Sequence, residues 1–462
     1  MISKQEIMDF AREFSLSAET IEKDYVLGWL LAGIANHPDL LDQWVFKGGT
    51  CLKKCYFETY RFSEDLDYTL TNISHLNERF LVNCFNQIAN WIYDASGIEL
   101  PTDSIRFEIY QNNAGKISSE GRVYYIGPLN RRGSMARIKL DLTADELLVL
   151  PAVLRDVHHP YSDKPKNGME AHCYNFAEVF AEKIRALGER ARPRDLYDVV
   201  HLYRHATPTE KPNLIFDVLQ KKCEYKKISV PTMQLLNMHP KLRELEREWP
   251  NMLAHQLPIL PAMQEFWQEL PNIFDWLHGN GNKILKEVIP QQFSEERIDY
   301  SWQPPSMIQA WHMNVPIELI RYAGANYLYL EIIYNNKARL IEPYNLKRTL
   351  EGNIILIAIE SKGNEWKSFR IDRIQNIKVT ATPFKPQYDI TLTPFTQDLP
   401  KESYNLYSQR TPSRQTSTLM YNYTIQCPIC NKKFKRQRLD TKLNAHKSLD
   451  GGQCPGRRGY NV

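Results

Sequence analysis

Apolar residues recur at helical spacing through several long segments of the chain. Within residues 5–35 the recurring positions predict helix, and Ser17 and Thr20 are suitable residues to begin its second half. The same spacing predicts helices over residues 75–95 and 176–190. Several prolines interrupt residues 207–290, which are otherwise helical in character and which we expect to form a helical half around a cleft.

Strand-like alternation begins after the second of these helices. Residues 105–110 and 122–126 alternate apolar and polar side chains around a polar connection, and this pattern predicts a hairpin. Residues 137–143 predict a further strand, with three apolar side chains on one face and Lys139 and Asp141 on the other. A chain that combines such strands with separate helices is predicted to have an α+β fold.

The chain of 462 residues is long for one domain. Beyond residue 320 the pattern changes to short strands with polar turns, which is typical of a small β-barrel. A stretch rich in Ser, Thr, Gln and Asn then has the character of a flexible linker. We therefore predict a multidomain chain with segments at residues 1–290, 300–394, 395–424 (the linker) and 425–462.

Composition and hydropathy favour a protein of the cytoplasm with no membrane partner. The hydrophobic content of 43% and the charged content of 24% are ordinary for soluble globular proteins. The first residues lack the pattern of a signal peptide. The longest apolar run, at residues 26–35, is too short to span a bilayer and is expected to form a buried helix.

Charge and cysteine content both single out the end of the chain. Nine Lys or Arg against two Asp give residues 427–462 a charge of 9 − 2 = +7, so the rest of the chain carries 4 − 7 = −3. A basic tail on a nearly neutral body indicates a polyanionic partner. The other cysteines show no framework and are expected to be small buried residues: Cys51, Cys55, Cys84, Cys173 and Cys223.

The stretch with the strongest chemical character is a Gly-Gly-Thr turn followed closely by two carboxylates. Gly48 and Gly49 allow a bound phosphate to approach the backbone, and Thr50 adds a hydroxyl donor. The strand period places Asp65 and Asp67 on one face, where paired carboxylates suit Mg²⁺. Either half alone has an ordinary explanation, a simple turn or a surface Asp-x-Asp, so the combination carries the prediction.

Residues 46–68 resemble the signature of the nucleotidyltransferase superfamily related to DNA polymerase β, in its AbiEii/AbiGii toxin branch. Further blocks resemble this branch at residues 22–25, 182–183 and 194–198, and the similarity covers roughly the first 290 residues. It implies a polymerase β-like fold with a helical half. The Glu-Lys-Asp cluster of residues 22–24 also has a plain explanation, as the solvated face of a helix.

The resemblance implies roles for several residues. Asp141 lies where the superfamily places its third carboxylate, so Asp65, Asp67 and Asp141 would bind Mg²⁺ or Mn²⁺; an exposed strand residue is the alternative for Asp141. Lys183 would contact the nucleotide phosphates, unless it extends along the protein surface, and Asp195 would orient nucleotide or metal. Asp198 has a structural alternative, in which it holds Arg194 or a helix end. The nucleotide-binding candidates are Lys47, Gly48, Gly49, Thr50 and Ser63.

The barrel region resembles a WYL domain, which has an Sm/SH3-like barrel and is implicated in sensing nucleic acid or small ligands. The resemblance rests on residues 342–344 and 369–374, and the Trp-Tyr-Leu that names the family is absent as such. It implies a basic and aromatic pocket formed by Arg339, Tyr344, Arg370 and Arg373. In the alternative, these arginines pair with Asp372 and Glu342.

The last segment has the spacing of a zinc module. Cys427, Cys430, His446 and Cys454 follow the pattern Cys-x2-Cys-x15-His-x7-Cys, which fills the four positions of tetrahedral Zn²⁺. So short a segment cannot bury enough surface to fold without such a metal, which makes the Zn²⁺ structural. Its basic residues suit nucleic acid, whereas a protein-binding zinc knuckle is the alternative.

Together these features predict a metal-dependent nucleotidyltransferase toxin of a toxin–antitoxin or abortive-infection system that defends against phage. It would use an NTP as substrate and transfer NMP to RNA, plausibly the 3′ end of tRNA, and a cognate antitoxin would restrain it. The alternative is a catalytically inactive, nucleic-acid-binding regulator that uses the WYL-like and zinc modules.

Overall fold

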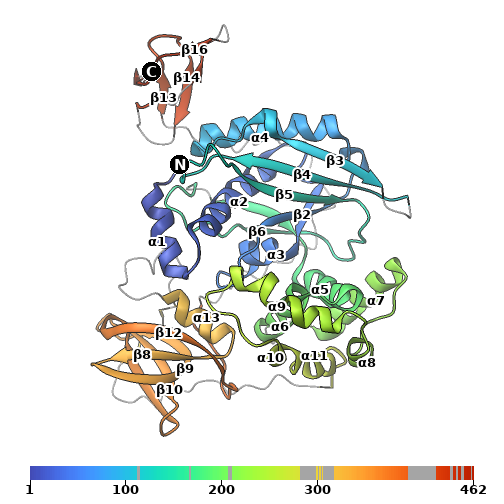
Figure 1. Cartoon of the computed structure of the whole chain (residues 1–462), viewed down its shortest axis with the longest axis vertical. Helices are drawn as coiled ribbons and strands as arrows, with labels where there is room; N and C mark the ends of the chain where they lie inside the picture. Colours follow the sequence, from blue (N-terminus) through green and yellow to red (C-terminus); the bar gives the residue numbers. More distant parts are fainter. Residues whose placement is uncertain are drawn as a thin grey trace.

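The computed structural model covers most of the chain (Figure 1). The residues it describes are 1–111, 115–165, 168–206, 211–280, 298–299, 301–302, 304, 317–393, 423–436, 441–443, 446–448, 452–458 and 460–461. Within them the chain forms a seven-stranded sheet, a helical region, a five-stranded sheet and a small C-terminal unit. None of the described helices is long and apolar enough to cross a membrane.

The predicted N-terminal helix is two helices, α1 (Lys4–Phe14) and α2 (Ala18–Asn36). Ser15 takes a left-handed backbone conformation with φ of 53°, which ends α1. Ser17 then begins α2 by accepting a hydrogen bond from the backbone N–H of Thr20. Periodicity alone did not separate the two helices because their apolar stripes continue across the break.

The seven-stranded sheet is mixed and has the order β3-β4-β5-β2-β1-β7-β6. Its central strands β2 and β5 are parallel, and the predicted hairpin of β3 and β4 is antiparallel. The strands are β1 (Trp44–Lys47), β2 (Asp65–Leu70), β3 (Arg106–Gln111), β4 (Ile117–Tyr125), β5 (Ala136–Thr143), β6 (Val153–Asp156) and β7 (Glu170–Cys173).

Helices cover this sheet on one face, and the other face carries the charged residues. Leu66 and Tyr68 of β2 are buried in the same core as α2 and α4 (Glu78–Ser96). Phe85 of α4 packs against Phe107 of β3 at a ring separation of 4.9 Å. Because side chains alternate along β2, Asp65 and Asp67 lie on the opposite face.

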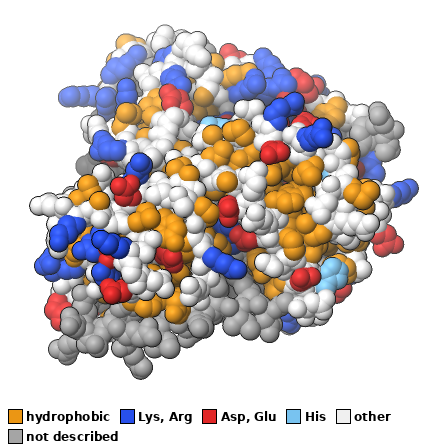
Figure 2. Space-filling model, turned by 60° about the horizontal axis from the view of Figure 1, so that its bottom comes forward, with side chains coloured by type: hydrophobic (Ala, Val, Ile, Leu, Met, Phe, Trp, Pro, Cys, Tyr) orange, Lys and Arg blue, Asp and Glu red, His pale blue; other side chains and the backbone are white. Residues whose placement is uncertain are grey.

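The helical region follows β7, as the proline-interrupted pattern predicts. Its first helix, α5, has the predicted bounds, and Pro193 is the first residue of α6. The helices are α5 (Phe176–Arg190), α6 (Pro193–His205), α7 (Pro212–Lys226), α8 (Met233–Asn237), α9 (Leu242–Leu253), α10 (Met263–Trp267) and α11 (Leu270–Leu277). On the face shown in Figure 2, apolar side chains gather near the centre, whereas Lys and Arg are interspersed with Asp and Glu nearer the edges.

The five-stranded sheet is antiparallel throughout and has the order β11-β10-β9-β8-β12. The prediction of strands from residue 320 was wrong at its start, because α13 (Ile317–Ala325) is a helix that packs on β8, β9 and β12. Closure into an Sm/SH3-like barrel stays a prediction. The strands are β8 (Leu328–Tyr334), β9 (Lys337–Arg348), β10 (Ile354–Glu360), β11 (Glu365–Arg370) and β12 (Ile374–Pro383).

The C-terminal unit consists of short strands around a small core. Ile425, Phe434 and Leu443 pack with Cys427 and Cys454 in this core. Its strand β14 lies against α4, at the top of Figure 1. The strands are β13 (Tyr423–Gln426), β14 (Lys433–Arg436), β15 (His446–Lys447), β16 (Gln453–Cys454) and β17 (Tyr460–Asn461). The predicted linker lies outside the described residues except for Tyr423 and Thr424.

Candidate functional site

The parallel pairing of β2 with β5 places the predicted carboxylates side by side. Asp67 lies opposite Asp141, and Asp65 lies opposite Lys139. Since parallel neighbours in register project to the same face, all three carboxylates lie on the face that α2 and α4 leave uncovered. The fold therefore gathers residues that are 76 positions apart in the chain, from Asp65 to Asp141.

The site carries negative charge that its own cations only partly offset. The pKa of Asp67 is raised to about 6: burial is the main cause, the charges of Asp141 and Asp65 add to it, and Lys47 and Lys183 oppose it. Burial likewise raises the pKa of Asp65. A carboxylate that is costly to ionise in this way is stabilised by an added cation.

The chemistry of this group fits Mg²⁺ or Mn²⁺, because carboxylate oxygens are the ligands that these hard cations prefer. Among the described residues, however, the three aspartates are not a group whose ligand atoms all lie within 4.8 Å of one another. Asp141 forms an ion pair with Lys139 at 3.1 Å, and Lys139 also lies 3.2 Å from Glu120. A metal would compete with Lys139 for Asp141.

The Gly-Gly-Thr turn opens the short helix α3 (Gly48–Cys51), which continues into a π-helical segment, Leu52–Tyr56. Gly48 has φ of 82°, and a Cβ there would lie 2.1 Å from Oδ2 of Asp67. A Cβ at Gly49 would lie 2.4 Å from the guanidinium of Arg61. Both glycines are thus required by the close approach of charged side chains of the site itself.

The other predicted nucleotide contacts lie around this turn with partners of their own. The Thr50 hydroxyl donates to the backbone carbonyl of Asp65 at 2.5 Å, and its side chain is buried. The ammonium of Lys47 lies 4.0 Å from Glu146 and faces the Tyr174 ring. Ser63 lies beside the turn as well, because a Cβ added at Gly49 would lie 3.1 Å from the Ser63 hydroxyl oxygen.

Lys183 is not extended along an outer surface but is buried in an ion network. Its ammonium lies 2.7 Å from Asp198 and 3.8 Å from Asp195. Asp198 also accepts two hydrogen bonds from Arg61, at 2.7 and 2.8 Å, and one from the Tyr60 hydroxyl. These contacts agree with the structural alternative for Asp198, although its partners are Arg61 and Lys183, whereas Arg194 was expected.

Asp195 is fully buried and held by a neighbour. Arg190 donates to both of its oxygens, at 2.7 and 2.8 Å. Arg194, the residue before Asp195 in α6, has its Nε buried without a hydrogen-bond partner. Burial lowers the pKa of Arg194, and the nearby charges of Asp65 and Glu64 oppose this shift. Arg194 is thus a further cation of the site. Its place in the sequence motif did not reveal this.

The Glu-Lys-Asp cluster on α2 is not a solvated face, so that interpretation was wrong for two of its three residues. Asp24 is buried against the ammonium of Lys54 at 2.6 Å. Glu22 is buried and accepts the backbone N–H of Leu129. Lys23 pairs with Glu64 at 2.8 Å, one residue before Asp65. The cluster therefore fixes α2 to the segments that carry the turn and the carboxylates.

The four predicted zinc ligands come together at the C-terminus. Their ligand atoms all lie within 4.8 Å of one another. Sγ of Cys427 is 3.7 Å from Sγ of Cys454, and Sγ of Cys430 is 3.3 Å from Nε2 of His446. Two or three thiolates with one imidazole suit tetrahedral Zn²⁺, so the donor set fits that metal.

In the five-stranded sheet, the described contacts favour paired arginines over an open pocket. Arg370 donates to both oxygens of Asp372, as the alternative predicts. Arg339 pairs with Glu360 at 2.8 Å, where Glu342 was expected. Tyr344 is fully buried and donates its hydroxyl to Glu342.

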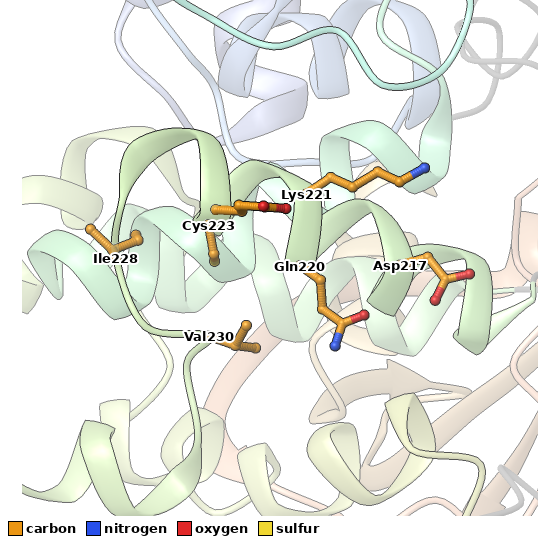
Figure 3. A pocket seen from close by; sticks show the side chains of 7 residues that line it. Asp217, Gln220, Lys221, Cys223, Ile228 and Val230 are labelled. Carbon is orange, nitrogen blue, oxygen red and sulfur yellow. The ribbon is translucent and has the colours of Figure 1, made fainter.

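A separate hollow lies on α7 (Figure 3). It has a volume of about 510 Å³ and is lined by Asp217, Gln220, Lys221, Cys223, Glu224, Ile228 and Val230. None of the predicted site residues lines it.

Comparison with protein families matches residues 29–277 to the nucleotidyl transferase AbiEii toxin of type IV toxin–antitoxin systems. The match spans 277 − 29 + 1 = 249 of the 462 residues, more than half of the chain. The protein belongs to the AbiEii family. It is therefore a nucleotidyltransferase toxin, and the alternative of a catalytically inactive regulator is not supported. Membership of this family also implies a nucleotide substrate and an antitoxin partner.

Solved structures similar to this AbiEii protein include JHP933 from Helicobacter pylori (19% identity, 57% of this chain, 94% of that chain, TM-score 0.36). Another is the nucleotidyltransferase toxin MenT4 from Mycobacterium tuberculosis (15% identity, 61% of this chain, 100% of that chain, TM-score 0.33). A third is the proteasome accessory factor PafBC of Arthrobacter aurescens (12% identity, 81% of this chain, 74% of that chain, TM-score 0.16). All three scores lie below 0.5, so these likenesses carry no further argument. No curated protein matches the chain.

Proposed function

We propose that this AbiEii toxin transfers NMP from an NTP to an RNA end, with Asp65, Asp67 and Asp141 as the metal-binding carboxylates. The register that sets Asp67 beside Asp141, on the face of the sheet that meets Lys183, carries the proposal. The buried negative charge of Asp67 supports it, because Lys47 and Lys183 offset this charge only in part and an added cation would balance it. Bound there, Mg²⁺ would neutralise charge on the phosphate oxygens of the NTP.

The reaction joins the acceptor to the α-phosphorus of the NTP. A hydroxyl oxygen of the RNA 3′ end forms the new P–O bond, the bond from the α-phosphorus to the bridging oxygen breaks, and pyrophosphate leaves. The proton of that hydroxyl goes to a base, for which Asp141 is the candidate on the carboxylate face. Lys47 and Arg194 would add positive charge beside the triphosphate, and Gly48, Gly49, Thr50 and Ser63 would line it.

Lys183 and Asp195 act in this scheme through their present partners. Lys183 already neutralises Asp198, so it contributes to the phosphates as one member of the Arg61–Asp198–Lys183 network. Asp195, held by Arg190, would orient that network toward the nucleotide. These two roles predict that either substitution weakens nucleotide binding as well as turnover.

The C-terminal unit is proposed to hold a structural Zn²⁺ and to bind nucleic acid through its basic residues. Its net charge of +7 and the grouped zinc ligands support this. The unit lies against α4, whereas the carboxylates lie on the opposite face of the sheet. A single RNA that contacts both would therefore have to pass around the sheet, which favours a long, structured acceptor such as tRNA. The five-stranded sheet is proposed to be a WYL-like sensor.

The test is a transfer assay with purified full-length protein, Mg²⁺, each labelled NTP in turn and total cellular RNA. We expect label in one RNA size class with the wild type, and none with Asp65→Ala/Asp67→Ala. The matched control is Asp42→Ala, an exposed aspartate outside the site, which should retain transfer. Label on protein in place of RNA would change the acceptor, and transfer by the double variant would reject the assigned carboxylates.

A further inference from the structure

Three cysteines that are scattered in the sequence meet directly behind the Gly-Gly-Thr turn. The sulfur atoms of Cys51, Cys55 and Cys173 all lie within 4.8 Å of one another. Cys51 ends α3, Cys55 lies in the π-helical segment, and Cys173 ends β7, where its backbone pairs with Phe46 of β1. From the sequence these cysteines were expected to be separate small buried residues. The structure instead brings these three together.

The spacing of these thiols suits coordination of one metal ion. Zinc–sulfur bonds of about 2.3 Å in a tetrahedral site set the sulfurs roughly 3.8 Å apart. The C-terminal group of the same chain shows this spacing, with 3.7 Å between Cys427 and Cys454. The three core thiols lie within 4.8 Å of one another, so small side-chain rotations would bring them onto one ion.

The surroundings select a soft ion and exclude a hydrated one. Cys51 and Cys173 are 0% exposed and Cys55 is 6% exposed, which leaves no room for a shell of water ligands. Neutral or anionic sulfur donors prefer soft cations such as Cu(I). Zinc takes four ligands in closed sites, and among the described residues this group offers three.

Positive charge near the cluster would balance the thiolates that a metal requires. Arg155 donates its Nε to the Cys55 carbonyl at 2.6 Å, and its guanidinium lies 4.1 Å from the centre of the Tyr56 ring. Burial acts to raise the pKa of Cys55, but hydrogen bonds from the other two thiols and the charges of Arg155 and Lys54 hold it below its ordinary value.

We propose that Cys51, Cys55 and Cys173 form a binding site for one Cu(I) ion. The ion enters in the monovalent state, so no electron is transferred. Copper–sulfur bonds form, and each thiol that coordinates as a thiolate releases its proton to solvent. The bound ion would join β7 to the end of α3, immediately after Gly48–Thr50, and would hold the turn in place. π-Helical segments such as Leu52–Tyr56 often mark functional positions in helices.

The test is an anaerobic Cu(I) titration of the full-length protein against a chromophoric Cu(I) chelator. The wild type should bind one more equivalent of Cu(I) than Cys173→Ala, since both proteins keep the same C-terminal thiols. Cys223→Ala, which removes a buried cysteine outside the cluster, should bind as much as the wild type. Equal binding by the wild type and Cys173→Ala would overturn the proposal.

A second variant and a second readout protect the result against misfolding. Cys51→Ala, in which Ala suits the helix, should lose the same equivalent while circular dichroism stays unchanged. Hydrogen exchange at Gly48–Thr50 should slow on copper loading in the wild type only; unchanged exchange there would refute the link to the turn. The nucleotide role of the turn rests on the proposed function, but neither measurement requires transferase activity, so the two proposals can fail separately.

Discussion

Single residues of the site are stabilised by partners far away in the sequence. Asp198 balances Arg61 and Lys183, and all three side chains are buried. Asp67, in contrast, is buried beside the like charges of Asp141 and Asp65, and burial together with these charges raises its pKa. These two aspartates should respond in opposite ways to loss of their charge.

For Asp67→Asn we expect a more stable metal-free protein and no transferase activity. The folded pKa of about 6 lies above the ordinary 3.8, so this group favours folding below pH 3.8 and loses that contribution as pH rises through 6. At pH 8 the variant should therefore gain about 1–2 kcal/mol, allowing for partial exposure. Thermal melts at pH 5 and pH 8 check this, and a gain that is larger at pH 5 would contradict it.

For Asp198→Asn we expect strong destabilisation at neutral pH. The substitution leaves the buried charges of Arg61 and Lys183 without their carboxylate, which typically costs about 3–5 kcal/mol. The midpoint of chemical unfolding measures the loss, with Asp42→Asn as an exposed control. A shift as small as that of the control would show that the network contributes little.

At the scale of elements, α13 connects the five-stranded sheet to the N-terminal part. Glu318 of α13 accepts a hydrogen bond from Thr59 at 3.0 Å and pairs with Arg321 at 2.5 Å. Glu13 of α1 faces the same pair, and α1 packs on α13. The hydrogen bond from Thr59 to Glu318 joins the segment after the π-helical turn to α13, which packs on the five-stranded sheet. Glu13, beside this contact, has a raised pKa.

The contact between α1 and α13 should weaken as pH rises. Burial first, and the charge of Glu318 second, raise the pKa of Glu13 from 4.5 to about 7, while Arg321 opposes them. Its stabilising contribution is present below pH 4.5 and is lost as pH rises through 7. Hydrogen exchange in α13, corrected for intrinsic rates, should be faster at pH 8 than at pH 6. Glu13→Gln should remove the difference, and a difference that persists would exclude Glu13 as its source.

At the scale of the whole molecule, we expect the fold of the C-terminal unit to depend on a bound metal, whereas the folds of the larger sheets should not. Its core holds three non-cysteine apolar residues, too few to stabilise a fold alone. A strong Zn²⁺ chelator, or Cys454→Ser, should therefore make residues near 423–461 sensitive to protease and leave the thermal midpoint of the remainder within a few degrees. Cys84→Ser serves as the matched cysteine control. Resistance of the chelated unit to protease would argue against a zinc-dependent fold.

Local patterns were sufficient for most elements. The bounds of α5 and the hairpin of β3 and β4 follow from apolar spacing, because a period of 3.6 or 2 determines which face each element buries. The helix α13 was missed, since it does not interrupt the run of apolar residues that periodicity detects, whereas Ser17 was identified as a cap and does begin α2. The Glu-Lys-Asp cluster was misread because burial of a charge depends on its partner.

By itself the sequence determined that Asp65 and Asp67 share a face, that a Gly-Gly turn precedes them, and that four metal ligands cluster at the C-terminus, because each depends on residues close in the chain. Only the tertiary structure decided which distant groups meet. The β2–β5 register places Asp141 beside Asp67, Arg61 reaches Asp198, and Cys173 joins Cys51. These contacts depend on strand order and packing, which local spacing does not specify.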